Sequence, residues 1–83
     1  MLRIYADWNS ATDDGWCWCL RYEERSLDEL ASGLGLTDGM RVVLFYSDVA
    51  EEFEFDGVLR SCHTSTGTRW EARADESSFR RIR

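Results

Sequence analysis

Three cysteines and the single histidine are the residues of this 83-residue chain whose types could do chemistry. Cys17, Cys19, Cys62 and His63 offer three thiolates and one imidazole, an accepted ligand set for structural zinc. Their spacing argues against such a site. Sulfur ligands of a tetrahedral zinc ion lie about 3.8 Å apart, whereas side chains two apart on a regular strand lie about 6.6 Å apart. We therefore expect structural thiols and no cofactor, and we keep a structural zinc site as an alternative.

A cysteine nucleophile activated by His63 is the enzymatic interpretation of the same residues. Such catalysis needs a base, oriented by a third group, beside an accessible thiol in a cleft. A chain of this length buries only about 60 to 65% of the surface that its unfolded form exposes, which leaves little room for a cleft. We expect no enzymatic activity and predict no catalytic residue.

Two groups of polar residues are candidates for binding. Tyr5, Asp7 and Asn9 alternate with apolar residues and therefore share one face of a strand. A tyrosine with hydrogen-bonding neighbours suits a protein contact, although an ordinary solvated sheet face has the same pattern. The second group is basic and consists of Arg69, Arg73, Arg80 and Arg81. Arg69 and Arg73 alternate with Trp70, so this strand predicts no stacking platform for nucleic-acid bases.

The charge of the chain is unevenly distributed. Residues 1–56 carry thirteen carboxylates and four arginines, a net charge of −9, and residues 57–83 carry three carboxylates and six arginines, a net charge of +3. We expect the two parts to neutralise each other within one fold or across a homodimer. The total of −6 disfavours nucleic acid as a partner, because phosphates need a basic surface. Binding through the C-terminal arginines remains the alternative.

The composition predicts a small cytoplasmic domain, residues 1–83, without a membrane segment. Its longest apolar runs, 16–20 and 42–46, are far shorter than the 18 or so residues of a membrane span. The odd number of cysteines argues against a disulfide framework and for reduced thiols. Eleven aromatic residues predict an aromatic-rich core. In the run 16–20 we expect Trp16, Trp18 and Leu20 on one strand face, with Cys17 and Cys19 on the other.

The periodicity of the chain predicts mostly strands. Residues 2–9 and 16–22 read as a hairpin, followed by a short helix that Ser26 and Glu29 begin with a capping box and Gly33 or Gly35 ends. Further strands are expected at 40–46, at 53–59 with a bulge or bend at Gly57, and at 69–74, with a loop at 63–68. A final helical turn, capped by Asp75, is expected to hold Phe79 and Ile82. The order β-β-α-β-β-β predicts an α+β fold, mostly β, resembling an SH3-like small barrel or a curled antiparallel sheet.

Several segments together resemble a family of small bacterial proteins of unassigned function. The segments are residues 4–9 (IYADWN), 27–30 (LDEL), 39–42 (GMRV) with Leu44 and Tyr46, and 57–58 (GV). Members of the family begin with an IYADFN strand, followed by a leucine-rich helix and a GM(R)V-L-Y strand. The resemblance extends to about residue 75 and implies no catalytic residue. Trp8 stands where the family has phenylalanine, and the cysteines and His63 are not part of its pattern.

The absence of catalytic and phosphate-binding motifs, together with a thin core and exposed sheet edges, favours an interaction module. We expect the chain to bind another protein or a second copy of itself. Nucleic-acid binding and a structural zinc site are the alternatives.

Overall fold

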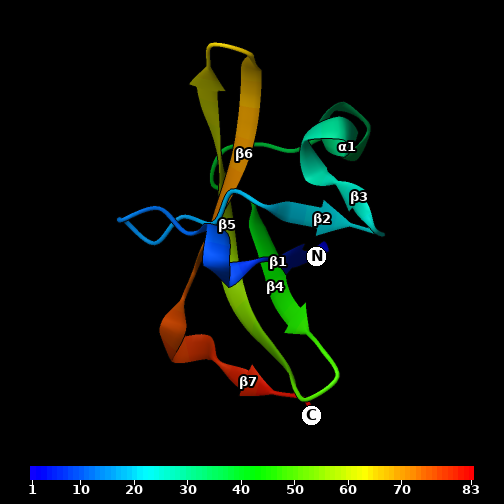
Figure 1. Cartoon of the computed structure of the whole chain (residues 1–83). Helices are drawn as coiled ribbons and strands as arrows, with labels where there is room; N and C mark the ends of the chain where they lie inside the picture. Colours follow the sequence, from blue (N-terminus) through cyan, green and yellow to red (C-terminus); the bar gives the residue numbers. More distant parts are fainter.

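The computed structural model describes residues 1–83, which form one open seven-stranded sheet with one α-helix (Figure 1). The fold is therefore α+β and mostly β. The helix α1 spans Leu27–Leu34, and it is too short to cross a lipid bilayer. The strands are β1 Arg3–Ala6, β2 Leu20–Tyr22, β3 Arg25–Ser26, β4 Arg41–Ser47, β5 Glu52–Thr64, β6 Gly67–Ala74 and β7 Arg80–Arg81, and two short 3-10 helices are η1 Trp8–Ser10 and η2 Glu76–Ser78.

The strands lie in the order β3-β2-β1-β4-β5-β6, and β7 also pairs with β5. The long strand β5 runs most of the length of the molecule, with β4 and β7 beside its first half and β6 beside its second half (Figure 1). The β1–β4 pair is parallel, so the expectation of a wholly antiparallel sheet was wrong. Two parallel neighbours need a long crossover connection, and β2, β3 and α1 provide it between β1 and β4. The predicted hairpin pairing of β1 with β2 is present and antiparallel.

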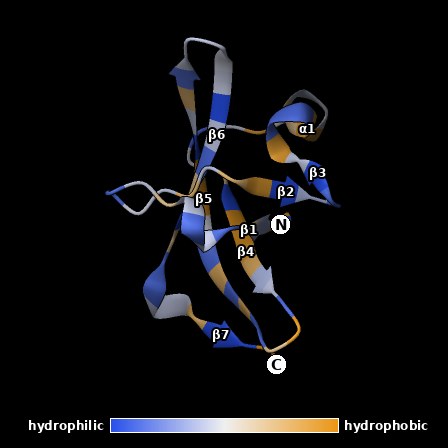
Figure 2. Ribbon diagram, in the orientation of Figure 1, coloured by the Kyte–Doolittle hydropathy of each residue, from blue (hydrophilic) through white to orange (hydrophobic).

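The hydrophobic core lies on the face of the sheet that α1 covers. Its ten members come from β1, β2, α1, β4, β5, β6 and the segment before β2. Figure 2 shows hydrophobic residues concentrated on β4 and alternating with hydrophilic ones along β5. In β1 the predicted alternation is confirmed, since Ile4 and Ala6 are buried while Arg3 is exposed. Only one tryptophan, Trp70, belongs to the core, so aromatic residues contribute less to it than the composition predicts.

The run 16–20 is oriented differently from the prediction. Cys17 is completely buried, whereas Trp18 is 47% exposed. Residues 16–19 precede β2, which begins at Leu20, and belong to no regular strand, so the period of two does not apply to them. Instead, the backbone of Cys17 pairs with that of Ala72 through hydrogen bonds of 2.7 and 2.9 Å. A thiol is small enough to pack there, which an indole is not, and burial raises the pKa of Cys17 to about 11.

The helix α1 has the predicted limits but not the predicted N-terminal cap. Ser26 is the N-cap residue, yet its side chain makes no capping hydrogen bond, and Glu29 lies 3.8 Å from Arg25. The capping box is therefore wrong. The C-terminal prediction is confirmed, because Gly35 has φ 65° and its N–H donates to Ala31 O.

Gly57 lies in a regular part of β5 rather than at a bulge. It pairs with Val42 on β4 and with Ala74 on β6, and its φ is not positive. A Cβ atom at this position would lie 2.5 Å from Leu44 Cδ1 and 2.9 Å from Arg73 O. The glycine is needed because neighbouring atoms approach closely, not because the backbone is strained.

The C-terminal third contains more strand than predicted. The expected loop at 63–68 shrinks to a turn at residues 65–66, because β5 continues to Thr64 and β6 begins at Gly67. Asp75 does cap a helical turn, accepting a hydrogen bond from Ser77 N at 3.1 Å. That turn is η2, which ends at Ser78. Phe79 and Ile82 were expected within it, but they lie beyond it on either side of β7.

Candidate functional site

Two residues of the predicted protein-contact surface, Tyr5 and Asp7, line an open hollow of about 400 Å³ on the outer face of the sheet. Tyr5 lies between Arg21 of β2 and Phe45 of β4 in the strand register, so all three side chains project from the same face. The complete lining consists of Tyr5, Asp7, Cys19, Arg21, Glu23, Glu24, Phe45 and Ser47.

The floor of this hollow is aromatic. The rings of Tyr5 and Phe45 meet edge to face, with centroids 5.6 Å apart and an interplanar angle of 79°. The Arg3 guanidinium lies over the Phe45 ring, 3.9 Å from its centroid. In this contact the guanidinium faces the negative potential of the aromatic ring, the geometry of a cation–π interaction.

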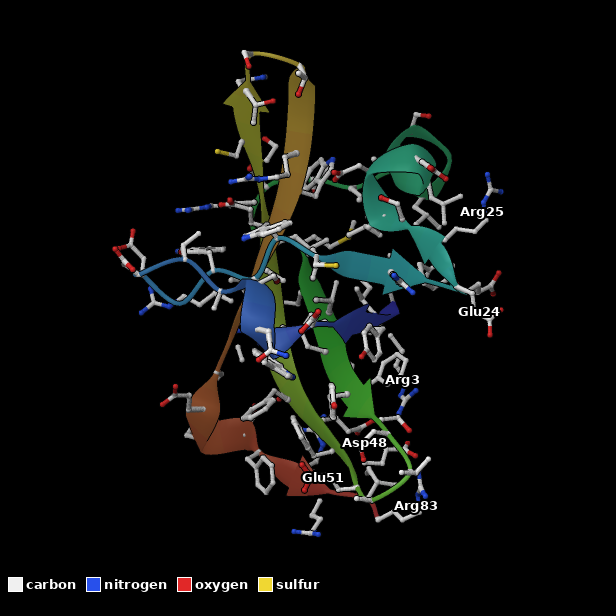
Figure 3. The ribbon with its side chains drawn as sticks, in the orientation of Figure 1. Arg3, Glu24, Arg25, Asp48, Glu51 and Arg83 are labelled. Carbon is white, nitrogen blue, oxygen red and sulfur yellow. The ribbon has the colours of Figure 1, made fainter.

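The rim of the hollow is acidic. Glu23 and Glu24 form the two-residue turn between β2 and β3, and Figure 3 shows Glu24 projecting from the tip of that turn. Both residues have positive φ angles, 52° and 68°, a conformation that hairpin turns normally fill with Asn-Gly. Neither carboxylate makes an ion pair or a hydrogen bond. With Asp7, the hollow holds three carboxylates and one guanidinium, that of Arg21.

The third residue of the predicted surface, Asn9, lies outside the hollow. The chain leaves the sheet after Ala6 and enters η1, so the predicted strand over residues 2–9 was too long. Asp7 Oδ1 accepts a hydrogen bond from Asn9 N at 2.9 Å and thereby caps η1. Asp7 therefore joins Tyr5, whereas the exposed Asn9 side chain does not.

The C-terminal arginines bind carboxylates of the same molecule. Arg80 contacts Glu54 at 3.2 Å and Asp56 at 3.1 Å. Arg81 lies 3.9 Å from Glu51, and Arg83 lies 4.0 Å from Glu52. Figure 3 shows Arg83, Asp48 and Glu51 gathered at the same end of the molecule. The interpretation that the acidic and basic parts neutralise each other within one fold is confirmed.

Arg69 belongs to a different ionic cluster. The Glu71 carboxylate is almost completely buried and accepts hydrogen bonds from Arg60 at 2.8 Å and Arg69 at 2.6 Å. Burial opposes the ionisation of Glu71, but the two arginines more than offset it, so its pKa is lowered. The Arg60 guanidinium lies 3.9 Å from the Trp16 ring centroid, and that of Arg69 lies 5.7 Å from the Trp18 centroid.

Arg73 is the one predicted arginine that makes no ion pair. It lies opposite Val58, which in turn lies opposite Arg41, so the two arginines project from the same face of three neighbouring strands. A hollow of about 250 Å³ lies here, and Asp56 and Asp75 also line it. The carboxylates balance the arginines, so this hollow has no clear preference for an anion.

The candidate zinc ligands do not come together. All three cysteines are free thiols, and no group of three or more His, Cys, Asp or Glu side chains is arranged to hold a metal ion. Cys62 lies opposite Arg69 on one face of β5, while His63 follows on the other face, opposite Thr68. Cys17 is buried against Ala72.

Sequence reasoning missed five residues of the hollow, and it considered a sixth, Cys19, only as a structural thiol or a zinc ligand. The five are Arg21, Glu23, Glu24, Phe45 and Ser47. Phe45 lies in the strand predicted at 40–46, but its position beside Tyr5 depends on the parallel β1–β4 register, which the sequence did not predict. Glu23 and Glu24 follow the strand predicted at 16–22, and no role was predicted for them. The sequence signal for this turn was the glutamate pair between two short strand patterns. It was missed because glutamate is rarely found at turn positions with positive φ.

Comparisons of the chain with family models, curated proteins and solved structures give no match. The site must therefore be interpreted from its own geometry.

Proposed function

We propose that the protein is a small, non-enzymatic protein-interaction module that binds a basic segment of its partner in the Tyr5 hollow. One observation carries the proposal: the lining combines an aromatic floor with three carboxylates and one guanidinium, that of Arg21. The other guanidinium near the floor, that of Arg3 over Phe45, is already paired with Glu52 and Glu54. An arginine or lysine side chain fits this chemistry, because its stem can pack on the rings while its charge meets the acidic rim.

The expected affinity comes from several weak contacts. A cation over an exposed aromatic ring contributes about 0.5–1 kcal/mol, and an exposed ion pair contributes about 0.2–1 kcal/mol. A single side chain therefore binds weakly, and a basic segment with several contacts is needed for useful affinity. The net charge of −6 also favours encounter with a cationic partner over an anionic one.

The test is a titration with a short arginine-containing peptide, followed by backbone amide NMR. We expect shifts at Tyr5, Phe45 and the β2–β3 turn, and weaker binding in the double variant Glu23→Gln, Glu24→Gln. The matched control is Asp13→Asn, Asp14→Asn, a second adjacent acidic pair that makes no ion pair. Equal losses in both double variants would mean that the peptide responds only to total charge, and the proposed site would be rejected.

A second copy of the chain is the alternative partner. A cluster of partly exposed aromatic rings supports this proposal: Phe79 is 51% exposed, its centroid lies 5.6 Å from that of Phe53 and 5.3 Å from that of Phe55, and Trp8 packs on the same cluster. Sedimentation equilibrium of the wild type and of Phe79→Ala measures self-association. Trp18→Ala is the control, because Trp18 is similarly exposed but lies outside the cluster.

Three further parts of the hypothesis have partial support. We propose a relationship to SH3-like small barrels, supported by the Cys17–Ala72 bridge at the outer edge of β6. A cytoplasmic location is supported by the three free thiols. Membership of the small bacterial family with the IYADFN strand rests on its motifs alone. The ion pairs of Arg80, Arg81 and Arg83 count against nucleic-acid binding through the C-terminus.

A further inference from the structure

A second hollow of about 400 Å³ lies beside α1, and it shares only Cys19 and Arg21 with the hollow of the proposed protein contact. Its lining consists of Trp18, Cys19, Leu20, Arg21, Ser26, Asp28 and Arg69. Two guanidiniums, a large aromatic ring and a hydroxyl therefore meet in one place. The residues come from three separate parts of the chain, which the fold brings together around β2.

Trp18 offers a free aromatic surface in this hollow. Its side chain is 47% exposed, and the Arg69 guanidinium lies 5.7 Å from its ring centroid. Trp16 differs, because Arg60 lies directly over its ring at 3.9 Å. Exposure of a large apolar ring is unfavourable in water, so a flat ligand that covers Trp18 would be stabilised by stacking.

The two arginines of the hollow have unused donors. Arg69 donates one hydrogen bond from Nη2 to Glu71, but its Nε–H is buried and has no acceptor. Arg21 makes no ion pair at all, and the Ser26 hydroxyl makes no capping hydrogen bond. A buried donor without an acceptor is destabilising, and an anion with several oxygens would supply acceptors for these groups.

The charge balance of the hollow favours one anionic group. Arg21 and Arg69 contribute two positive charges, and Asp28 contributes one negative charge. Asp28 Oδ1 already accepts a hydrogen bond from Trp70 N at 2.8 Å, so this carboxylate has a partner. Glu71 is not part of the lining, and its single charge is shared between Arg60 and Arg69.

We infer that this hollow binds a nucleotide unit, with the base stacked on Trp18 and the phosphate held by Arg21 and Arg69. A simple anion would leave the Trp18 ring uncovered, and a simple aromatic compound would leave the two guanidiniums without an acceptor. The ligand therefore carries both a flat ring and an anionic group. A free mononucleotide and the end of an oligonucleotide present the same chemistry. A long nucleic-acid strand does not fit the acidic remainder of the molecule.

The experiment compares AMP, adenosine, inorganic phosphate and a short oligonucleotide as ligands, using the tryptophan indole N–H signals in NMR. We expect AMP to shift the Trp18 signal and to bind more tightly than adenosine or phosphate. Trp18→Ala should weaken AMP binding about tenfold, within the range expected for loss of one stacked base. Equal affinity for AMP and the oligonucleotide indicates free nucleotide as the source, and tighter binding of the oligonucleotide indicates a strand end.

Arg69→Gln removes an ion pair of the buried Glu71 and could therefore unfold the protein. Arg21→Gln is for this reason the decisive arginine variant. It should weaken AMP binding while strengthening the binding of a basic peptide in the Tyr5 hollow, because Arg21 lines both hollows. Arg73→Gln is the control, since Arg73 also makes no ion pair but lies in neither hollow.

The inference is overturned if AMP binds no better than phosphate, or if Trp18→Ala and Arg21→Gln bind AMP as the wild type does. The Glu23→Gln, Glu24→Gln variant should weaken the binding of the basic peptide without weakening AMP binding, which separates this site from the protein contact.

Discussion

At the scale of single residues, close packing decides where glycine is required. Gly57 and Gly33 both lack a positive φ, but a Cβ atom at Gly33 would meet nothing within 4 Å. At Gly57 the same atom would meet Leu44 and the backbone of Arg73. Gly57→Ala should therefore lower the free energy of unfolding by about 1–3 kcal/mol, the usual cost of overpacking.

Gly33→Ala is the matched control for this prediction. It lies within α1, where alanine is favoured over glycine by about 1 kcal/mol. Urea unfolding of both variants should give shifts of opposite sign in the midpoint. A Gly57→Ala protein as stable as the wild type would show that β4 and β6 can move apart without cost.

Glu71 binds the two arginines, Arg60 and Arg69, whose guanidiniums lie near the rings of Trp16 and Trp18. Glu71→Gln would leave Arg60 and Arg69 without their shared carboxylate, and each of these side chains is 38% exposed, so water can replace part of the interaction. We expect a loss of about 1–3 kcal/mol in the free energy of unfolding, less than for a fully buried pair. Glu29→Gln, which removes an exposed ion pair with Arg25, should change stability by less than about 0.5 kcal/mol. Equal effects of the two substitutions would contradict the special position of Glu71.

At the scale of elements, the β2–β3 turn links stability to the proposed function. Glu23 and Glu24 both adopt the left-handed conformation, which costs a side-chain-bearing residue roughly 1 kcal/mol. The double substitution Glu23→Asn, Glu24→Gly should raise the free energy of unfolding by about 1 kcal/mol and weaken the binding of a basic peptide. Thermal unfolding and peptide titration of the same variant measure both effects. A variant that is more stable but binds the peptide with unchanged affinity would show that Glu23 and Glu24 do not contribute to binding.

The elements also show what could be predicted from the sequence. The strands β1, β4 and β6 and the glycine at the end of α1 have local signals, and their predicted presence agrees with the structure. The alternation predicted for β6 holds only in part, because Glu71 is buried beside Trp70 and Ala72. The parallel β1–β4 pairing and the Cys17–Ala72 bridge join residues far apart in the sequence, and no local pattern encodes them. Only two of the eight residues that line the hollow around Tyr5 were predicted, Tyr5 itself and Asp7, and Phe45 was missed for the same reason, because it reaches the hollow through the β4 register.

At the scale of the whole molecule, the acidic composition is largely structural. Five aspartates accept hydrogen bonds from backbone N–H groups, and they are Asp7, Asp28, Asp38, Asp48 and Asp75. Six further carboxylates form ion pairs with arginines. The net charge of −6 therefore does not by itself identify a binding surface, and the unpaired Glu23 and Glu24 become informative by contrast.

The same contacts predict how the stability of the whole molecule depends on pH. The pKa is lowered below its ordinary value for Asp38, Asp48, Glu54, Glu71 and Asp75, chiefly by hydrogen bonds from backbone N–H groups, serine hydroxyls or arginines. The unfolded state then binds more protons than the folded state as pH falls. These groups stabilise the fold fully above their ordinary pKa values of 3.8 and 4.5, and the stabilisation is lost as pH falls below them.

Cys17 acts in the opposite direction, because its pKa is raised from 9.0 to about 11. Its contribution is complete below pH 9.0 and is lost as pH rises toward about 11.

We therefore expect a plateau of stability between about pH 5 and pH 9, with losses on both sides. Urea unfolding from pH 3 to pH 11 measures the profile. Cys17→Ala should flatten the alkaline side specifically, because it removes the thiol that the unfolded state ionises more readily. Asp13→Asn, Asp14→Asn should leave the acid side unchanged, because these carboxylates make no ion pair or hydrogen bond that the fold would lose. A profile that stays flat down to pH 3 would show that the aspartate caps and the arginine pairs contribute little, and the acidic composition would then need another explanation.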